Sequence, residues 1–191
     1  MLTPSFKLVV GLGNPGIRYE DTRHNAGQWF LDHLREAWGY PRFEQVGAND
    51  VAEGTVGGAE VRLMKPRTYM NRSGIALKHL RLLGFDPAGY LLVVVDDVAL
   101  PPGKARFRRR GGPGGHNGLR SVEWAVGQRE YARLRLGVGV APPGVYLPDW
   151  VLAPPTDEEK KAIVGRFPDL VSCVEVWATK GIEAAMNECN A

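Results

Sequence analysis

Two histidines and one carboxylate stand at segment boundaries of this sequence and could carry acid–base chemistry. His24 opens a helical segment, His116 opens another, and Asp96 ends the most apolar strand. A neutral imidazole can accept a proton, and a carboxylate on its other ring nitrogen fixes the tautomer. We therefore expect His24 to be a general base that Asp96 orients. His116 is the rival base, but its surroundings, GGPGGHNG, favour a mobile loop and a structural or binding role.

No nucleophile for covalent catalysis stands out. The sequence has no G-x-S-x-G elbow, Ser73 is placed as a helix cap, and Cys173 and Cys189 lie in a C-terminal helical stretch away from the polar residues. A base without a nucleophile indicates direct attack by water. The two cysteines and four scattered histidines lack the spacing of metal ligands, so we expect no metal and no other cofactor.

Amide side chains occupy the same kind of position as the histidines. Asn14 follows the first strand, Asn25 and Asn71 precede helices, and Asn117 precedes a third helix. In open α/β sheets these junctions meet at the carboxyl ends of the strands, where ligands bind. Asparagine is also a preferred helix cap, so capping is the alternative for each residue. Capping does not explain why a histidine accompanies two of them.

The motif GLGNPG after the first strand matches the dinucleotide fingerprint G-x-G-x-x-G. A nucleotide-binding oxidoreductase is therefore an alternative function. We disfavour it because residues 17–21 lack a helical stripe and Pro15 suits a turn better than a helix start.

The periodicity of apolar residues predicts which elements position these side chains. We expect a single domain over residues 1–191, of the α/β class, with a twisted mixed sheet flanked by helices on both faces. A capping box at Thr156 and Glu159 should open a helical region that breaks at Pro168 and Gly181. The expected strands are residues 7–11, 51–56, 61–64, 91–95, 105–109 and 133–140, and the expected helices are residues 29–38, 73–83 and 119–126.

Composition limits the class of protein. The chain has 191 residues, 44% of them hydrophobic, and its longest apolar run, residues 91–95, is too short to cross a bilayer. The first residues, MLTPSFK, do not form a signal peptide, so we expect a cytoplasmic protein with no membrane partner. Two cysteines in 191 residues favour a reducing compartment.

The positive charge is concentrated in one segment. The net charge is +3, yet residues 104–110 read KARFRRR, with five basic residues in seven. Such a stripe attracts phosphate groups. The alternatives are a solvated strand face or a non-catalytic RNA-binding module, although such a module gives no reason for His24 and Asp96.

Four motifs together resemble bacterial peptidyl-tRNA hydrolases: residues 9–27 (VVGLGNPGIRYEDTRHNAG), 65–74 (KPRTYMNRSG), 96–119 (DDVALPPGKARFRRRGGPGGHNGL) and 133–139 (RLRLGVG). The resemblance covers nearly the whole chain in order. It implies a monomeric, metal-free enzyme of one α/β domain that hydrolyses the ester bond of peptidyl-tRNA. His24 is then the proton acceptor, and Asp96 its partner.

The resemblance also implies roles for the remaining residues. Asn14 stands where the family distinguishes a peptidyl nitrogen from a free amine, and Met70 would line the peptide channel. The catalytic set is His24, Asp96, Asn117 and Asn14, and the expected substrate-binding residues are Tyr19, Tyr69, Met70, Asn71, Asn25, His116, Arg108 and Arg135.

This chain departs from the family at three places. Ala99 replaces a frequent aspartate, Tyr69 replaces a frequent phenylalanine, and the loop after Gly139 lacks a lysine that some members carry. The last change puts tRNA contacts of that loop in doubt, but not the chemistry.

Overall fold

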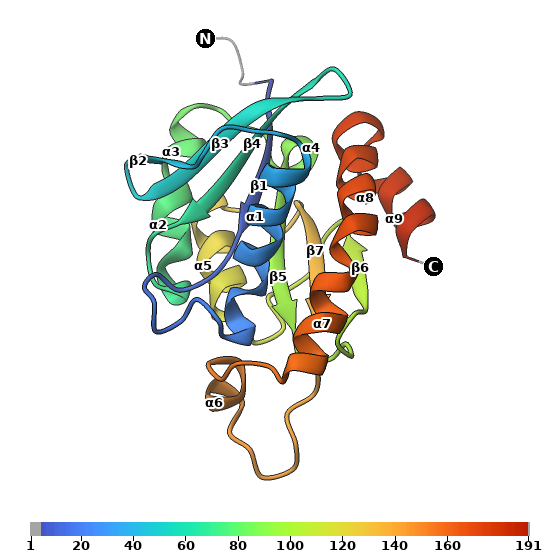
Figure 1. The fold of residues 1–191 in the computed structure, drawn as a ribbon. Helices are drawn as coiled ribbons and strands as arrows, with labels where there is room; N and C mark the ends of the chain where they lie inside the picture. The colour runs from blue at the N-terminus through green and yellow to red at the C-terminus, as the bar shows by residue number, and fades with distance from the viewer. Residues whose placement is uncertain (1–4, 191) are drawn as a thin grey trace.

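In the computed structural model, which describes residues 5–190, a seven-stranded sheet runs through the centre of the molecule (Figure 1). The spatial order of the strands is β2-β3-β4-β1-β5-β7-β6. In chain order they are β1 (Lys7–Gly11), β2 (Glu44–Val46), β3 (Asn49–Val56), β4 (Ala59–Pro66), β5 (Leu91–Asp97), β6 (Ala105–Arg108) and β7 (Ala132–Gly137).

The sheet is parallel at its centre and antiparallel at its edges. Strand β1 pairs in parallel with β4 and β5, and β5 pairs in parallel with β7. The hairpin β3–β4, the edge strand β2 and the edge strand β6 add antiparallel pairs. The predicted mixed sheet is therefore confirmed, and the carboxyl ends of β1, β5 and β7 meet at one edge.

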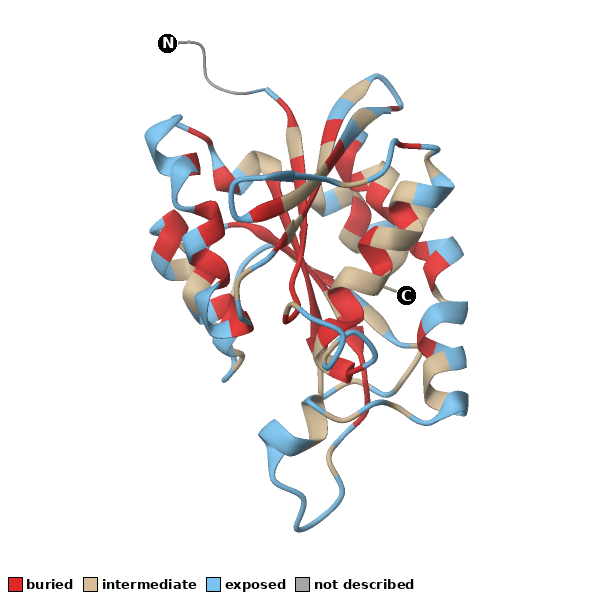
Figure 2. Cartoon of the chain, turned by 60° about the vertical axis from the view of Figure 1, so that its left-hand side comes forward, coloured by how far each residue is buried: buried red, intermediate tan, exposed pale blue. Residues whose placement is uncertain are grey.

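Helices cover both faces of the sheet, as predicted. Helices α1 and α8 pack on one face and α2 and α5 on the other, so β5 sends Leu92 into one apolar cluster and Val93 into the other (Figure 2). The helices are α1 (Ala26–Ala37), α2 (Ser73–Leu77), α3 (His79–Leu82), α4 (Pro87–Tyr90), α5 (Asn117–Val126), α6 (Leu147–Val151), α7 (Asp157–Gly165), α8 (Phe167–Lys180) and α9 (Ile182–Cys189).

The predicted helix boundaries in the C-terminal third are confirmed. Thr156 and Glu159 form a reciprocal capping box at the start of α7. Pro168 lies in the first turn of α8, and Gly181, with φ of 92°, separates α8 from α9. The single helix predicted over residues 73–83 is instead two short helices, α2 and α3.

Cys173 and Cys189 form a disulfide that ties α8 to α9. The expectation of a reducing compartment did not anticipate this bond, because the two residues meet only when α9 folds back on α8. Among the described residues, no helix combines the length and the apolar character that a membrane span requires.

Candidate active site

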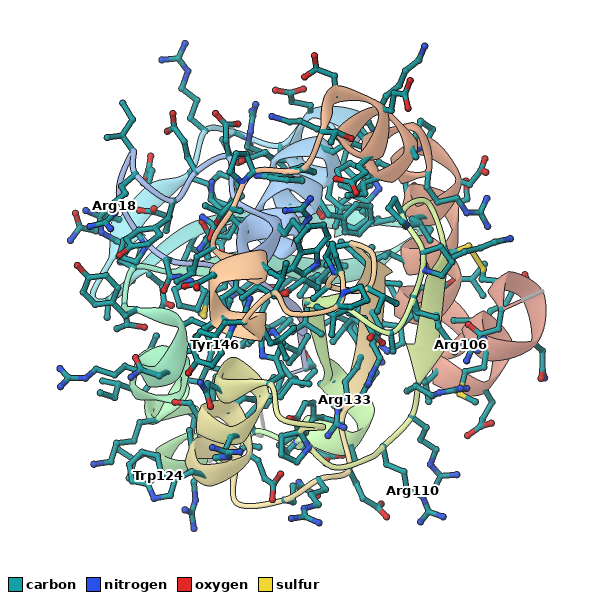
Figure 3. The ribbon with its side chains drawn as sticks, turned by 90° about the horizontal axis from the view of Figure 1, so that it is seen from below. Arg18, Arg106, Arg110, Trp124, Arg133 and Tyr146 are labelled. Carbon is teal, nitrogen blue, oxygen red and sulfur yellow. A yellow bond between two sulfur atoms is a disulfide. The ribbon has the colours of Figure 1, made fainter. Side chains whose placement is uncertain are left out.

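A pocket of about 690 Å³ opens at the carboxyl ends of the central strands. Five segments contribute amide, imidazole and carboxylate side chains to it, and helix α6 with its flanking loop lies at the same end of the molecule (Figures 1 and 3). Those polar residues are Asn14, His24, Asn71, Asp96, Asp97, His116 and Asn117.

His24, Asp96 and His116 form one hydrogen-bonded unit in this pocket. Nδ1 of His24 lies 2.9 Å from both carboxylate oxygens of Asp96. Nε2 of His116 lies 2.9 Å from Oδ1 of the same carboxylate. Asp96 is buried at the end of β5, whereas His24 is 13% and His116 is 12% exposed in the side chain. One carboxylate therefore holds both imidazoles.

The hydrogen bonds assign a proton to each imidazole. Nδ1 of His116 accepts from the backbone N–H groups of Gly118 and Leu119 at the start of α5, at 3.1 and 3.3 Å. The proton of His116 is therefore on Nε2, which donates to Asp96. An ionised carboxylate only accepts, so Nδ1 of His24 also donates to Asp96. When His24 is neutral its lone pair is therefore on Nε2, for which no protein partner is found within residues 5–190.

The charge of Asp96 is secured by its two partners. Burial alone would raise the pKa of this carboxyl group. The hydrogen bonds from His24 and His116, with the charge that either ring carries when it is protonated, outweigh burial and hold the pKa of Asp96 below its usual range. Asp96 is therefore ionised at neutral pH and remains an acceptor for both rings.

Asn14 is fixed by two neighbours, and this decides which group it offers to a ligand. Oδ1 of Asn14 accepts from the backbone N–H of Met70 at 2.7 Å. The backbone N–H and carbonyl of Asn14 are held by the side chain of Asn25, at 2.8 and 2.9 Å. The amino group of Asn14 is therefore its free donor beside the pocket. Asn25 is buried, and its side chain fixes the backbone of Asn14 through these two hydrogen bonds.

The glycine-rich motif brings the first strand close to helix α1. A Cβ atom on Gly11 would lie 2.5 Å from the carbonyl oxygen of Gly27, and one on Gly27 would lie 2.4 Å from that of Val94. Helix α1 begins only at Ala26, ten residues after Gly16. The motif therefore serves close packing of β1, α1 and β5, and it lacks the helix start that a dinucleotide site needs.

The apolar part of the pocket has two walls. Tyr19 and Tyr69 form one wall, with ring centroids 6.2 Å apart in an edge-to-face arrangement, together with Met70. Helix α6 and the residue after it form the other wall, through Leu147, Pro148, Val151 and Leu152. None of these four residues was predicted from the sequence to line the pocket. The apolar run VAPPGVYLPDW was the signal for this wall, but an apolar Pro-rich loop does not say where it folds.

Four arginines share one face of the sheet edge that β6 and β7 form. Arg106 is opposite Arg135, and Arg108 is opposite Arg133, in the antiparallel pair β6–β7. The guanidinium of Arg133 is buried and donates to backbone carbonyls of residues 111, 112 and 129, so only Arg106, Arg108 and Arg135 of this set are left for an anionic ligand. Arg135 lines the pocket and lies 3.5 Å from Asp97, whereas Arg108 lies outside the pocket on β6.

The fold and the pocket together define an α/β enzyme with a histidine–carboxylate pair. A family model described as peptidyl-tRNA hydrolase matches residues 8–191. The chain is 44% identical over 184 residues to a peptidyl-tRNA hydrolase of Chloroflexus aggregans, covering 96% of this chain and 98% of that protein. It is 45% identical over 188 residues to that of Symbiobacterium thermophilum, with the same coverage. The chain belongs to the peptidyl-tRNA hydrolase family.

A solved structure supports the same assignment. The crystal structure of peptidyl-tRNA hydrolase from Acinetobacter baumannii matches with a TM-score of 0.86 at 32% identity, covering 100% of this chain and 97% of that chain. The family resemblance and the fold class predicted from the sequence are thus confirmed, and the chain is a hydrolase of this family.

Proposed function

We propose that this protein hydrolyses the ester bond between a peptide and the 3′ end of its tRNA, with a water molecule that His24 activates. The observation that carries the proposal is the hydrogen bond between Nδ1 of His24 and Asp96 at the amide-lined pocket, which leaves Nε2 of His24 available to accept a proton. Family membership supports peptidyl-tRNA as the substrate.

The proposed reaction moves one proton through His24. Nε2 takes a proton from water as the water oxygen attacks the ester carbonyl carbon. Asp96 stabilises the imidazolium, and the amides of Asn71 and Asn117 donate to the oxyanion or orient the water. The tetrahedral intermediate expels the 3′ oxygen of the tRNA, which receives the proton from Nε2. General-base help contributes a factor of about 10²–10⁴ in rate.

Asn14 supports a preference for peptidyl-tRNA over aminoacyl-tRNA. Oδ1 of Asn14 already accepts from the N–H of Met70, whereas no hydrogen bond within residues 5–190 uses its amino group, so we expect Asn14 to donate to the substrate. A peptidyl substrate offers a carbonyl oxygen next to its nitrogen, and this oxygen accepts. An aminoacyl substrate offers an ammonium group instead, which repels another donor.

The proton positions also support a mechanism without metal. His24, Asp96 and His116 are close enough together to be considered as metal ligands. A neutral imidazole that bound a metal through Nε2 would need its proton on Nδ1. Nδ1 of His116 instead accepts two backbone N–H groups, so a metal here would break the start of α5.

The arginine face supports binding of the tRNA phosphates. Arg135 lines the pocket, and Arg108 lies outside the pocket on β6, where the phosphates of a tRNA that extends along this edge of the sheet can reach it. Phosphate contacts of this kind make binding sensitive to salt. We expect the enzyme to act as a monomer in the cytoplasm, where its substrate is produced.

The test is single-turnover hydrolysis of peptidyl-tRNA in EDTA by wild type, His24→Ala and the control His79→Ala. His79 is an exposed histidine on α3, outside the pocket. We expect folded His24→Ala to lose more than about 100-fold in rate, and His79→Ala and EDTA to change nothing. A near-normal rate for folded His24→Ala would refute the role of His24, and a loss in EDTA would refute the metal-free reaction.

A further inference from the structure

Arg23, the residue directly before His24, is buried although it carries a charge. Its side chain is only 3% exposed. Its guanidinium donates to the backbone carbonyls of Trp150, Ala153 and Pro154 at 3.1–3.3 Å, and to Oε2 of Glu159 at 2.7 Å. It also lies 3.4 Å from the centre of the Trp150 ring. A buried charge with this many partners is fixed in one position.

The partners of Arg23 lie at one place in the fold, where α6 ends and α7 begins. Trp150 belongs to the last turn of α6, and Ala153 and Pro154 follow that helix. Glu159 is part of the capping box that opens α7. The backbone N–H of Arg23 donates to the carbonyl of Ala153 as well, at 3.1 Å. Both the main chain and the side chain of Arg23 therefore hold this junction.

Helix α6 is attached at a second point. The indole N–H of Trp150 donates to the carbonyl of Gly139, just after β7, at 2.9 Å. The loop between Gly139 and Trp150 projects from the molecule (Figure 1), and its Tyr146 is 69% exposed. The α6 wall of the pocket is thus held by the hydrogen bonds of Arg23 and of Trp150. Arg23 is also the residue that precedes His24 in the chain.

We propose that Arg23 is a positioning residue that fixes His24 relative to the α6 wall of the pocket. The inference rests on the proposed role of His24 as general base. Arg23 does not reach the substrate, since its guanidinium is enclosed by α6, Trp150 and α7. It acts by holding the turn Arg23–Asn25 against the wall, so that Nε2 of His24 and the bound ester keep a fixed separation.

Lysine at position 23 is the informative substitution. It preserves the charge, but a single ammonium group cannot make the forked contacts of a guanidinium to three carbonyls and a carboxylate. A displacement of about 1 Å at a catalytic group can cost about 100-fold in rate. We therefore expect Arg23→Lys to lower the single-turnover rate about tenfold or more while the protein remains folded.

The matched control is Arg62→Lys. Arg62 also stacks on an aromatic ring, 3.9 Å from the centre of Phe6, and pairs with Glu53 at 3.0 Å, but it lies toward the opposite end of β1. We expect Arg62→Lys to hydrolyse peptidyl-tRNA at the wild-type rate. Melting curves of both variants separate a loss of folded protein from a loss of rate.

A double-mutant cycle shows whether Arg23 acts through His24. In the His24→Ala background, Arg23→Lys should change the residual single-turnover rate by less than about twofold, because no base remains to be positioned. A wild-type rate for Arg23→Lys would overturn the proposal, as would an equal fold-loss in both backgrounds. If the proposed role of His24 is itself wrong, the result differs, because the single variant His24→Ala would keep its activity.

Discussion

Replacing Asn14 by aspartate changes the group that this residue offers to a substrate from a hydrogen-bond donor to an acceptor. One carboxylate oxygen can still accept from the N–H of Met70, so the local structure is retained. The other oxygen takes the place of the amino group and accepts where asparagine donated. A peptide carbonyl then faces a second acceptor, whereas the ammonium group of an aminoacyl-tRNA finds a negative charge.

The size of this effect follows from the burial of Asn14. The residue is only 8% exposed, so water cannot replace the missing hydrogen bond. An unsatisfied buried acceptor costs about 1–3 kcal/mol, and a hydrogen bond to a charged group contributes about 1.5–3 kcal/mol. About 2 kcal/mol against the peptidyl substrate and about 2 kcal/mol in favour of the aminoacyl substrate each correspond to roughly 30-fold. Together they lower the preference by about 1,000-fold.

The assay compares kcat/KM for peptidyl-tRNA and aminoacyl-tRNA in wild type, Asn14→Asp and Asn187→Asp. The control makes the same chemical change at an exposed position of α9, outside the pocket. We expect the control to keep the wild-type preference. If folded Asn14→Asp also keeps it, the donor of Asn14 does not select the substrate.

Three further predictions concern Asp96, the arginine stripe and the disulfide. Asp96→Asn should lower kcat at least about 100-fold. The amide oxygen of the variant still accepts from His116, so its N–H group points at Nδ1 of His24 and the proton of that ring moves to Nε2. An unchanged kcat would contradict the assignment of the proton to Nδ1 of His24 in the wild type. Replacing Arg108 and Arg109 by glutamine should reduce the slope of log affinity against log salt by about 0.7–0.9 for each phosphate that the variant no longer binds. An equal slope would mean that neither arginine contacts a phosphate of the tRNA. Cys189→Ser should destabilise the fold by about 3 kcal/mol, which corresponds to a Tm lower by roughly 6–12 °C. Dithiothreitol should lower the Tm of the wild type by the same amount. If neither the substitution nor dithiothreitol shifts Tm, the disulfide is not formed.

The proximity of His24 and Asp96 could be predicted because each residue stands in a local sequence pattern that places it at the same edge of the sheet. A buried apolar strand carries Asp96 just before its last residue, Asp97, and a helix begins two residues after His24. In a parallel sheet such strand ends and helix starts lie at the same edge, so the two residues had to be neighbours. The shared carboxylate with His116 was less evident, since a glycine-rich loop can take many paths before α5.

The second wall of the pocket could not be predicted, because long-range contacts place it. Arg23 and the carbonyls that hold α6 are 127–131 residues apart in the sequence. The local sequence of an apolar loop does not predict a contact with a residue so far away in the chain. The edge strand β2 was missed for a related reason: its residues, EQV, are all exposed and carry no apolar alternation. The disulfide depends in the same way on how α9 folds against α8.

The central claim is that His24 is neutral, with its proton on Nδ1 and a free lone pair on Nε2. Nitrogen-15 NMR of the histidine rings at neutral pH measures this directly, because protonated and bare ring nitrogens resonate apart. We expect a bare Nε2 for His24 and a bare Nδ1 for His116, with Asp96→Asn exchanging the two positions in His24. A proton on Nε2 of His24 in the wild-type protein would contradict its role as the base.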